Sequence, residues 1–373
     1  MKILIAPDKF KGCLTAAEAA ELMAEGVRAA GAGHEITLLP IADGGEGTAD
    51  AVRAALQGVW IEAASHDARG RPITGRYAWL EAGRVAVIEM SAVAGLASLA
   101  PQECDPLTAT TYGVGELMLD ACRRGARRII TGLGGSATND AGMGMAGALG
   151  WHFLPKPADG NWVTPRDFLS LTDMVPPTAL GLETWPEIVG ACDVTNPLLG
   201  PRGATRVYGP QKGATAADVE TLETALRHVA DLVALRGGLD KRDTPGAGAA
   251  GGLGYGLMTF AGGRLTSGFD LVAELIGLEA AIARCDLVLT GEGCLDGQTL
   301  DGKGPAGVAA LARRHGRPII ALAGRVRTEA RAAGIFDRCV ALADDDVPTA
   351  TALREAASRL RAATREAVLA AGA

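Results

Sequence analysis

The sequence predicts an α/β protein in which both chain ends build one parallel-sheet domain and a second α/β domain is inserted between them. Residues 1–58 and 276–373 share an alternation of short apolar strands with helical segments, which is typical of a parallel sheet. The intervening part contains strands joined by short turns, as in an antiparallel meander. We therefore predict one α/β domain from residues 1–58 and 276–373, and an inserted mixed α/β domain carrying a glycine loop from residues 59–275.

Length and composition limit the classes of function. The chain has 373 residues, of which 48% are hydrophobic and 21% charged, and its net charge is −7. This size suggests about two domains, and the acidic balance without a basic stripe argues against nucleic-acid binding. No apolar stretch suits a membrane helix or an export signal, and the seven cysteines form no CxxC pair. We expect a cytoplasmic protein with reduced thiols and no membrane partner, as a monomer or homodimer.

The N-terminal segment predicts a strand, a helix and a second strand. Apolar residues 2–6 form the first strand, and residues 36–39 form the second. Between them, Thr15 and Glu18 have the spacing of a capping box, and the helix that they start ends at Gly31. A crossover of this kind joins parallel strands, so the loops after both strands meet at the carboxyl edge of the sheet.

Those two loops carry charged residues suited to binding a ligand. The loop at residues 7–12 supplies Asp8, Lys9 and Lys11, and the glycine-containing loop at residues 42–48 supplies Asp43 and Glu46. The alternative is that both loops are surface turns whose charges serve solubility.

The central segment, residues 131–147 with the sequence TGLGGSATNDAGMGMAG, is organised as a strand end, a glycine loop and a helix start. Glycine tolerates positive φ, which lets successive N–H groups converge on an anion, and a following helix N-terminus would add donors. Gly132, Gly134 and Gly135 can therefore adopt positive φ without a Cβ clash. The residues predicted to bind phosphate or substrate are Gly134, Gly135, Ser136, Thr138 and Asn139. A plain tight turn is the alternative.

A third polar segment follows the apolar strand at residues 188–191. Asp193 comes just after this strand, where a ligand-facing carboxylate is often found, and Asn196 and Lys212 lie in the same loop region. An Asx turn leading into Asn196 explains Asp193 equally well. The helix that follows, from Thr215 to about Leu235, has an apolar stripe that indicates only core packing.

The α/β alternation returns with a strand at residues 286–289, and further strands are predicted at residues 319–322 and 339–342. Glu292, Asp296 and Lys303 lie between this strand and a helix at residues 305–315. Residues 297–303 contain most of a phosphate-loop pattern, but Gly304 stands where a Ser or Thr would hold Mg²⁺.

Two segments match the GxGxxG pattern of dinucleotide-binding proteins, at residues 142–147 and 246–251. No strand directly precedes the second, and the first lacks the strand and acidic residue that should follow it. A Rossmann-type nicotinamide-dependent oxidoreductase acting on a small hydroxy acid is therefore the alternative function.

Taken together, seven motifs resemble those of the bacterial glycerate kinases of the first type, in the same order and across nearly the whole chain. They are APDKFKG (6–12), ADGGEGT (42–48), GLGGSATNDAGMGM (132–145), CDVTNPLLG (192–200), YGPQKGA (208–214), PGAGAAGGLG (245–254), and TGEGCLDGQT with GKGPAGVA (290–309).

The resemblance implies ATP-dependent phosphorylation of D-glycerate to 2-phosphoglycerate, in preference to 3-phosphoglycerate, with Mg²⁺. It also implies a Rossmann- or flavodoxin-like domain beside a second α/β domain, with the site in the cleft between them. Under this reading Asp193 and Lys11 are catalytic, with Asp193 either the base or a metal ligand. The substrates would be held by Lys9, Gly134, Gly135, Ser136, Thr138, Asn139, Asn196, Lys212 and Lys303, and Mg²⁺ by Asp43, Glu292 and Asp296.

Overall fold

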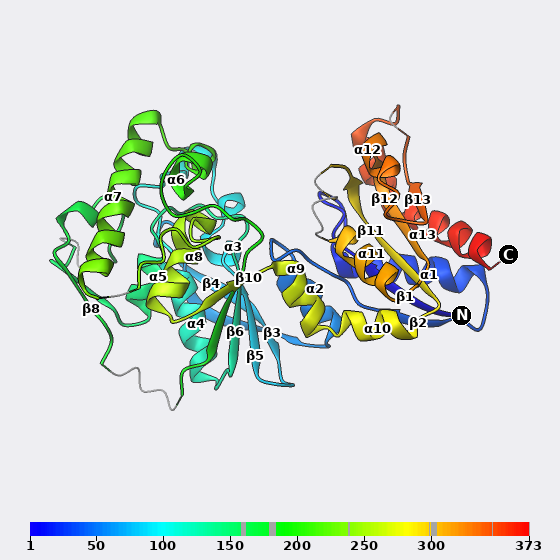
Figure 1. Cartoon of the computed structure of the whole chain (residues 1–373), viewed down its shortest axis with the longest axis horizontal. Coiled ribbons are helices and arrows are strands. Elements are labelled where there is room, and N and C mark those ends of the chain that lie inside the picture. The colour runs from blue at the N-terminus through cyan, green and yellow to red at the C-terminus, as the bar shows by residue number, and fades with distance from the viewer. Residues whose placement is uncertain are drawn as a thin grey trace. The chain divides into compact units, whose positions relative to one another are not determined.

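The computed structural model describes residues 1–157, 162–178, 184–237, 239–297, 299, 304–344 and 346–372. The chain forms two compact units (Figure 1): unit 1 comprises Met1–Asp43, Asp50–Gly58 and Phe269–Ala373, and unit 2 comprises Gly44–Ala49 and Val59–Gly268. We propose these units as the two domains. The chain returns to unit 1 at Phe269, so helix α9 (Gly268–Leu275) lies almost entirely in unit 1. The predicted boundary at residue 276 had placed this helix in the inserted domain.

Unit 1 is built on a parallel five-stranded sheet with the order β13-β12-β11-β1-β2. Its strands are β1 (Lys2–Pro7), β2 (Glu35–Leu38), β11 (Leu287–Leu295), β12 (Ile319–Val326) and β13 (Arg338–Ala341). This is the flavodoxin-like order, in which the direction of winding reverses between β1 and β11. Sheets of this class bind ligands at the carboxyl ends of the strands beside that reversal.

Helices cover both faces of this sheet (Figure 1). On one face α1 (Ala16–Ala30) packs against α13 (Thr349–Ala371), and their apolar side chains meet those of the strands in one core. On the other face α11 (Pro305–Arg314) packs against β11 and α10 (Leu278–Arg284). Thr15 and Glu18 form the predicted capping box of α1. The remaining helices are α2 (Thr48–Ala55), which was not predicted, and α12 (Thr328–Ala332).

Unit 2 contains a mixed six-stranded sheet with the order β10-β9-β6-β5-β4-β3. The predicted meander is present in β3, β4 and β5, but β5 pairs in parallel with β6, and the parallel part continues through β9 and β10. The bounds are β3 (Val59–His66), β4 (Pro72–Leu80), β5 (Val85–Glu89), β6 (Arg128–Gly132), β9 (Glu187–Ala191) and β10 (Arg264–Thr266), with a separate antiparallel pair of β7 (His152–Leu154) and β8 (Asp173–Val175).

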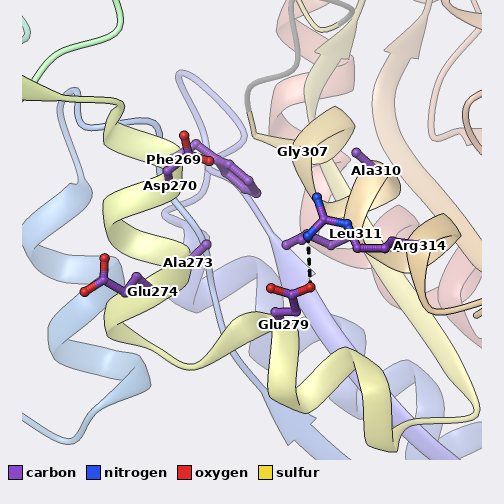
Figure 2. Close-up of a pocket in the computed structure, with 9 residues that line it drawn as sticks. All are labelled: Phe269, Asp270, Ala273, Glu274, Glu279, Gly307, Ala310, Leu311 and Arg314. Atoms are coloured by element: carbon purple, nitrogen blue, oxygen red, sulfur yellow. Dashed lines mark hydrogen bonds and ion pairs between the residues drawn. The ribbon is translucent and has the colours of Figure 1, made fainter.

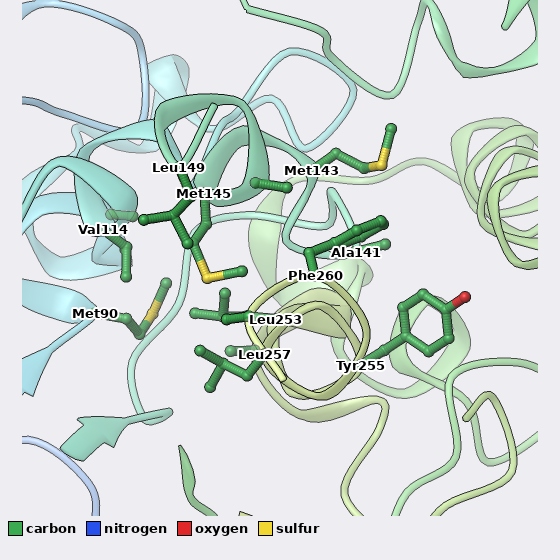
Figure 3. Close-up of a cluster of buried hydrophobic side chains, with 14 of the residues drawn as sticks. Met90, Val114, Ala141, Met143, Met145, Leu149, Leu253, Tyr255, Leu257 and Phe260 are labelled. Carbon is green, nitrogen blue, oxygen red and sulfur yellow. The ribbon is translucent and has the colours of Figure 1, made fainter. Parts of the chain in front are cut away.

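The helices of unit 2 enclose an apolar core beside the glycine loop. Figure 3 shows Met90 and Met145 gathered in this core with Leu253 and Leu257, which both belong to one helix. The helices are α3 (Ser91–Ala94), α4 (Tyr112–Arg123), α5 (Met143–Ala148), α6 (Ala204–Tyr208), α7 (Ala216–Leu235) and α8 (Ala249–Phe260), with 3₁₀ turns at Leu96–Ser98, Pro101–Glu103, Phe168–Ser170 and Pro210–Lys212. Among the described residues, no helix has the length and apolarity needed to cross a membrane.

Candidate active site

A pocket of about 840 Å³ lies at the carboxyl ends of the strands of unit 1, and we call it the carboxylate pocket. This volume is within the range of roughly 300–1,000 Å³ that is usual for small-molecule sites. The pocket brings together the predicted residues Lys9, Lys11, Asp43, Glu292 and Asp296. It also includes Asp8, a charged residue of the first loop that was not assigned to the site. The predicted Lys303 lies outside the described residues.

Asp8 is held rigidly at the end of β1. Its N–H donates to the carbonyl of Gly291 at 2.8 Å, and its Oδ1 accepts the N–H of Lys9 at 2.6 Å. Only 7% of Asp8 is exposed, and burial raises the pKa of its carboxyl to about 6. The nearby ammonium of Lys9 opposes this rise, whereas the carboxylate of Asp43 adds to it.

Glu292 is the second carboxyl group of the pocket with a raised pKa. It lies within β11 rather than in the loop predicted after it, because β11 continues to Leu295. Burial, with a smaller contribution from the carboxylates of Asp8, Asp296 and Asp43, raises the pKa of Glu292 to about 7. The Thr299 hydroxyl, which donates to Glu292 Oε1 at 2.8 Å, acts in the opposite direction. A bound cation would relieve this mutual repulsion.

The donor set fits a magnesium ion that is shared with phosphates. Among the described residues, no group of three or more His, Cys, Asp or Glu side chains is placed to hold an ion by itself. Mg²⁺ in kinase sites is usually held by one or two carboxylates together with substrate phosphates and water, so a complete protein cage is not required. Asp43, Glu292 and Asp296 are suited to that partial role.

Two arginines of the pocket were missed by the sequence analysis. Arg325 and Arg327 lie at the carboxyl end of β12, next to β11. The Arg325 guanidinium donates to the carbonyl of Val347 at 2.7 Å. A parallel strand beside β11 must end at the same edge of the sheet, so these arginines could have been predicted. The predicted strand ended at Leu322, too early to include them.

The glycine loop of unit 2 follows β6, and its glycines serve two purposes. Gly135 uses the freedom of glycine, with φ of 71° in the left-handed region. Gly132 and Gly134 do not have positive φ. These two are glycines because another loop approaches them: a Cβ would lie 2.9 Å from Gly44 O at Gly132 and 2.8 Å from Gly45 Cα at Gly134.

The same loop presents consecutive backbone donors. The N–H groups of Gly134, Gly135 and Ser136 donate no hydrogen bond to any residue that the structure describes. The loop is held by its neighbours, because Leu96 N–H donates to Gly135 O at 2.8 Å and Ala137 N–H donates to Ala94 O at 2.9 Å. Successive free N–H groups around a left-handed residue form a concavity that suits a carboxylate or a phosphate.

The helix N-terminus expected behind the loop is occupied by the protein itself. The carboxylate of Asp140 accepts the N–H groups of Gly142 at 3.0 Å and Gly144 at 3.2 Å, and it also accepts the Thr111 N–H and hydroxyl, each at 2.8 Å. Burial raises the pKa of Asp140, and these four hydrogen bonds oppose that rise. The expected contribution of this helix to anion binding is therefore wrong.

Thr138, Asn139 and Lys212 lie beneath the loop and are buried. The Lys212 ammonium donates to Thr138 O at 2.7 Å, and Asn139 Nδ2 donates to Thr205 Oγ1 at 2.9 Å. Burial lowers the pKa of Lys212 to about 7, against the attraction of Asp140. Thr138 Oγ1 and Asn139 Oδ1 have no hydrogen-bond partner in the described structure. These three residues are therefore placed to support the loop from within.

Asp193 and Asn196 follow β9, and both take part in local hydrogen bonds. Asp193 is half-buried, and its Oδ1 accepts the N–H of Gly268, the first residue of α9, at 3.0 Å. Asn196 Nδ2 donates to Arg202 O at 2.7 Å, and its Oδ1 accepts the Tyr208 hydroxyl at 2.8 Å. Both ends of the Asn196 side chain thus hold its own loop.

The two GxGxxG segments are packed against other parts of unit 2. A Cβ at Gly251 would overlap Thr138 O, and a Cβ at Gly144 would overlap Thr110 Oγ1. These glycines allow close packing of backbone on backbone, which leaves no room for a pyrophosphate beside them. The geometry therefore does not favour a dinucleotide site.

Unit 1 has a second, smaller pocket of about 300 Å³ (Figure 2). It lies among α9, α10 and α11, where Phe269 faces Gly307 and the Arg314 guanidinium donates to Glu279 Oε1 at 3.0 Å. None of the predicted site residues lines it. The carboxylate pocket is therefore the stronger candidate in this unit.

Comparison with known proteins gives one consistent family. The family model described as "Glycerate kinase family" matches residues 3–371. A glycerate kinase of Bacillus subtilis (strain 168) is 41% identical over 372 residues, covering 98% of this chain and 96% of that protein. The glycerate 2-kinase of Escherichia coli (strain K12) is 42% identical over 329 residues, covering 87% and 85%. A crystal structure described as glycerate kinase 2 from Salmonella typhimurium LT2 has a TM-score of 0.88 at 39% identity, covering 100% of this chain and 99% of that chain.

Proposed function

Because the chain belongs to the glycerate kinase family and is an ATP-dependent kinase, we propose that it transfers the terminal phosphoryl group of ATP to D-glycerate. We propose 2-phosphoglycerate as the product in preference to 3-phosphoglycerate, since one close relative is named a glycerate 2-kinase. The observation that supports this function best is the carboxylate pocket at the winding reversal of unit 1, in a chain matched by the family model over residues 3–371.

The carboxylate pocket is the proposed nucleotide site. Phosphoryl transfer depends on positioning and on neutralising phosphate charge rather than on a covalent residue. Lys9, Lys11, Arg325 and Arg327 supply positive charge in this pocket, and Lys11 is exposed where it can reach a ligand. The carboxylates of Asp43, Glu292 and Asp296 would hold Mg²⁺ together with the phosphates. The ion, when bound, neutralises negative charge on the phosphoryl group.

The glycine loop is the proposed site for an anionic group of the substrates, either the glycerate carboxylate or a phosphate. The free N–H groups of Gly134, Gly135 and Ser136 would make the direct hydrogen bonds. Thr138, Asn139 and Lys212 are buried, so we propose that they hold the loop in its binding shape rather than touch the ligand in this conformation.

Asp193 is the proposed acceptor for the proton of the attacking hydroxyl. An alcohol is a weak nucleophile at neutral pH, and a positioned carboxylate can take its proton as the phosphoryl group arrives. The strand end and the hydrogen bond from Gly268 fix the backbone and one oxygen of Asp193. Mg²⁺ ligation remains the competing role.

The test is to incubate the protein with ATP, Mg²⁺ and D-glycerate, with L-glycerate as control, and to follow ADP. We expect ADP release that depends on D-glycerate. Enolase identifies the product, because it converts 2-phosphoglycerate directly to phosphoenolpyruvate but acts on 3-phosphoglycerate only after a mutase. Phosphoenolpyruvate that appears only with the mutase would contradict the proposed regiochemistry. ADP release without glycerate, or NADH oxidation with hydroxypyruvate, would contradict the kinase assignment.

A further inference from the structure

We propose that the apolar side of the carboxylate pocket binds the purine base of the nucleotide. We call this side the base wall, and it consists of Leu342, Ala343, Ala352, Leu353 and Ala356. The proposal rests on the assignment of the carboxylate pocket as the nucleotide site, and it adds which part of the pocket receives which part of ATP.

The base wall is formed by one face of α13 together with the end of β13. Thr349, Ala352, Leu353 and Ala356 all line the pocket and follow the i, i+3, i+4, i+7 spacing of a single helix face. Farther along the helix, Leu360 and Val368 continue this face into the core of unit 1, where α13 packs on α1. In the first two turns of α13, the apolar face borders the pocket instead of the core.

Leu353 is the large apolar side chain of this wall, and it is 40% exposed. Ala343 and Ala356 also line the pocket, and because they are small and buried they do not protrude into it as Leu353 does. A flat aromatic base could lie on the alanines with its edge against Leu353, which would remove apolar surface from water. Glycerate is small and polar, so it has no group that would use such a surface.

The carboxylates and lysines of the pocket lie apart from the base wall, with Arg325 and Arg327 of β12 between them. Asp8, Lys9 and Glu292 lie at the ends of β1 and β11, whereas the base wall lies at β13 and α13. In the sheet order, β13 is three strand spacings from β1, which is about 14 Å at the usual interstrand distance. A nucleotide that spans the pocket would place its phosphates at one end and its base at the other.

Two glycines leave the floor between these ends without side chains. A Cβ at Gly324 would lie 2.5 Å from Gly293 O, and a Cβ at Gly293 would lie 3.0 Å from Lys11 N. Both glycines line the pocket, and their close backbone contacts explain why larger residues are excluded. The middle of the pocket is therefore floored by backbone, which is where the ribose would pass.

The experiment compares ligands with and without a base in two matched variants. Leu353→Gln changes the base wall, and Leu369→Gln makes the same change at a position on α13 that is 47% exposed and does not line the pocket. Calorimetry with Mg²⁺ would give dissociation constants for ADP and for tripolyphosphate. We expect Leu353→Gln to weaken ADP binding about fivefold or more, and to leave tripolyphosphate binding unchanged. Leu369→Gln should change neither.

Equal weakening of ADP and tripolyphosphate binding by Leu353→Gln would overturn the base wall, as would no change in either. These results leave the proposed kinase function standing, because glycerate-dependent ADP release is measured separately. Failure of the unaltered protein to bind ADP or ATP would overturn both proposals together.

A second measurement uses the unaltered protein and does not depend on the folding of a variant. Irradiation with 8-azido-ATP and Mg²⁺ attaches the base to nearby residues, and mass spectrometry locates the label. We expect the label in the peptide covering residues 342–356, and we expect excess ATP to prevent it. ATP-protected label found only in other peptides would overturn the proposal.

Discussion

The ammonium of Lys212 lies 2.7 Å from the carbonyl oxygen of Thr138, and only 1% of this lysine is exposed. A buried charge is costly unless it is paired, and the carboxylate of Asp140 attracts Lys212. Lys212 therefore stabilises the glycine loop by donating a hydrogen bond to the backbone carbonyl of Thr138. Its role in this conformation is to position the loop rather than to neutralise substrate charge at the surface.

Replacing Lys212 by Met should change how stability depends on pH. Burial lowers the pKa of Lys212 to about 7, whereas the unfolded chain binds this proton up to an ordinary lysine pKa. Unfolding then takes up a proton above pH 7, so the free energy of unfolding of the unaltered protein should rise with pH relative to Lys212→Met. The slope should approach about 1.4 kcal/mol per pH unit. Urea unfolding between pH 6 and pH 9 checks this.

The control for that prediction is Lys2→Met, which removes an exposed lysine. It should give no difference in slope between pH 7 and pH 9. Parallel stability curves for Lys212→Met and the unaltered protein over this range would mean that the lysine stays charged in the fold, and that Asp140 compensates its burial fully.

A Cβ at Gly135 should disturb the proposed anion site. Gly135→Ala and Gly262→Ala both place alanine at a positive φ, 71° and 67°, so each should lose about 1 kcal/mol of stability. Gly262 has no atom within 4 Å of the added Cβ, whereas at Gly135 the Cβ meets Ser91 Cβ at 3.2 Å beside the free N–H groups. Only Gly135→Ala should raise the KM for a substrate, by about tenfold. Equal kinetics in both variants would remove the loop from the site.

The sequence predicted those parts of the structure that depend on local signals or on strand topology. The capping box at Thr15 is local, and it starts α1 as expected. Lys11, Asp43 and Glu292 line one pocket because the carboxyl ends of parallel strands and the loops after them lie at one edge of the sheet. No long-range contact had to be known for either prediction.

Contacts between distant segments could not be predicted in this way. Gly134 is a glycine because Gly45 approaches it, and nothing near either residue in the sequence indicates that pairing. The burial of Lys212 has the same origin, since a lysine in a polar loop gives no sign that it will lie under Thr138. In the sequence, Asp140 is one more polar residue of the loop. In the structure, its carboxylate accepts four hydrogen bonds and fixes the start of α5.

Asp140→Ala should destabilise unit 2 strongly. The change removes the acceptor for four donors in a fully buried place, and unsatisfied buried donors cost roughly 1–3 kcal/mol each before relaxation. We expect a loss of about 3 kcal/mol or more in urea unfolding. Asp167→Ala is the matched control, because the Asp167 carboxylate is half-buried and accepts the N–H and hydroxyl of Thr164, two donors rather than four. Its loss should be about 1 kcal/mol.

Glu292→Gln should raise the Mg²⁺ concentration needed for activity. The variant keeps the size of the side chain and removes the charge that the proposed ion would contact. Turnover at low Mg²⁺ should fall by about tenfold or more, and excess Mg²⁺ should restore part of it. Glu279→Gln, which changes a glutamate of the smaller pocket, is the control and should leave the Mg²⁺ dependence unaltered. Loss of turnover that no amount of Mg²⁺ restores would contradict the ligand role.

Asp193 can be tested with two substitutions that separate its structural hydrogen bond from its proposed chemistry. In Asp193→Asn the amide oxygen can still accept the Gly268 N–H, so the free energy of unfolding should stay within about 0.5 kcal/mol of the unaltered protein. In Asp193→Ala that hydrogen bond is lost, at a cost of about 1 kcal/mol. If Asp193 accepts the hydroxyl proton, kcat should fall about 100-fold or more in both variants, with the Mg²⁺ dependence unchanged.

The three possible roles of Asp193 then give different patterns of stability, turnover and metal dependence. A metal ligand would raise the Mg²⁺ requirement in both variants, with partial rescue by excess ion. A purely structural residue would leave Asp193→Asn nearly as active as the unaltered protein and lower only the stability of Asp193→Ala. We expect the pattern of a proton acceptor, a large fall in kcat for the stable asparagine variant, because the strand end and the Gly268 hydrogen bond hold the Asp193 carboxylate in one position.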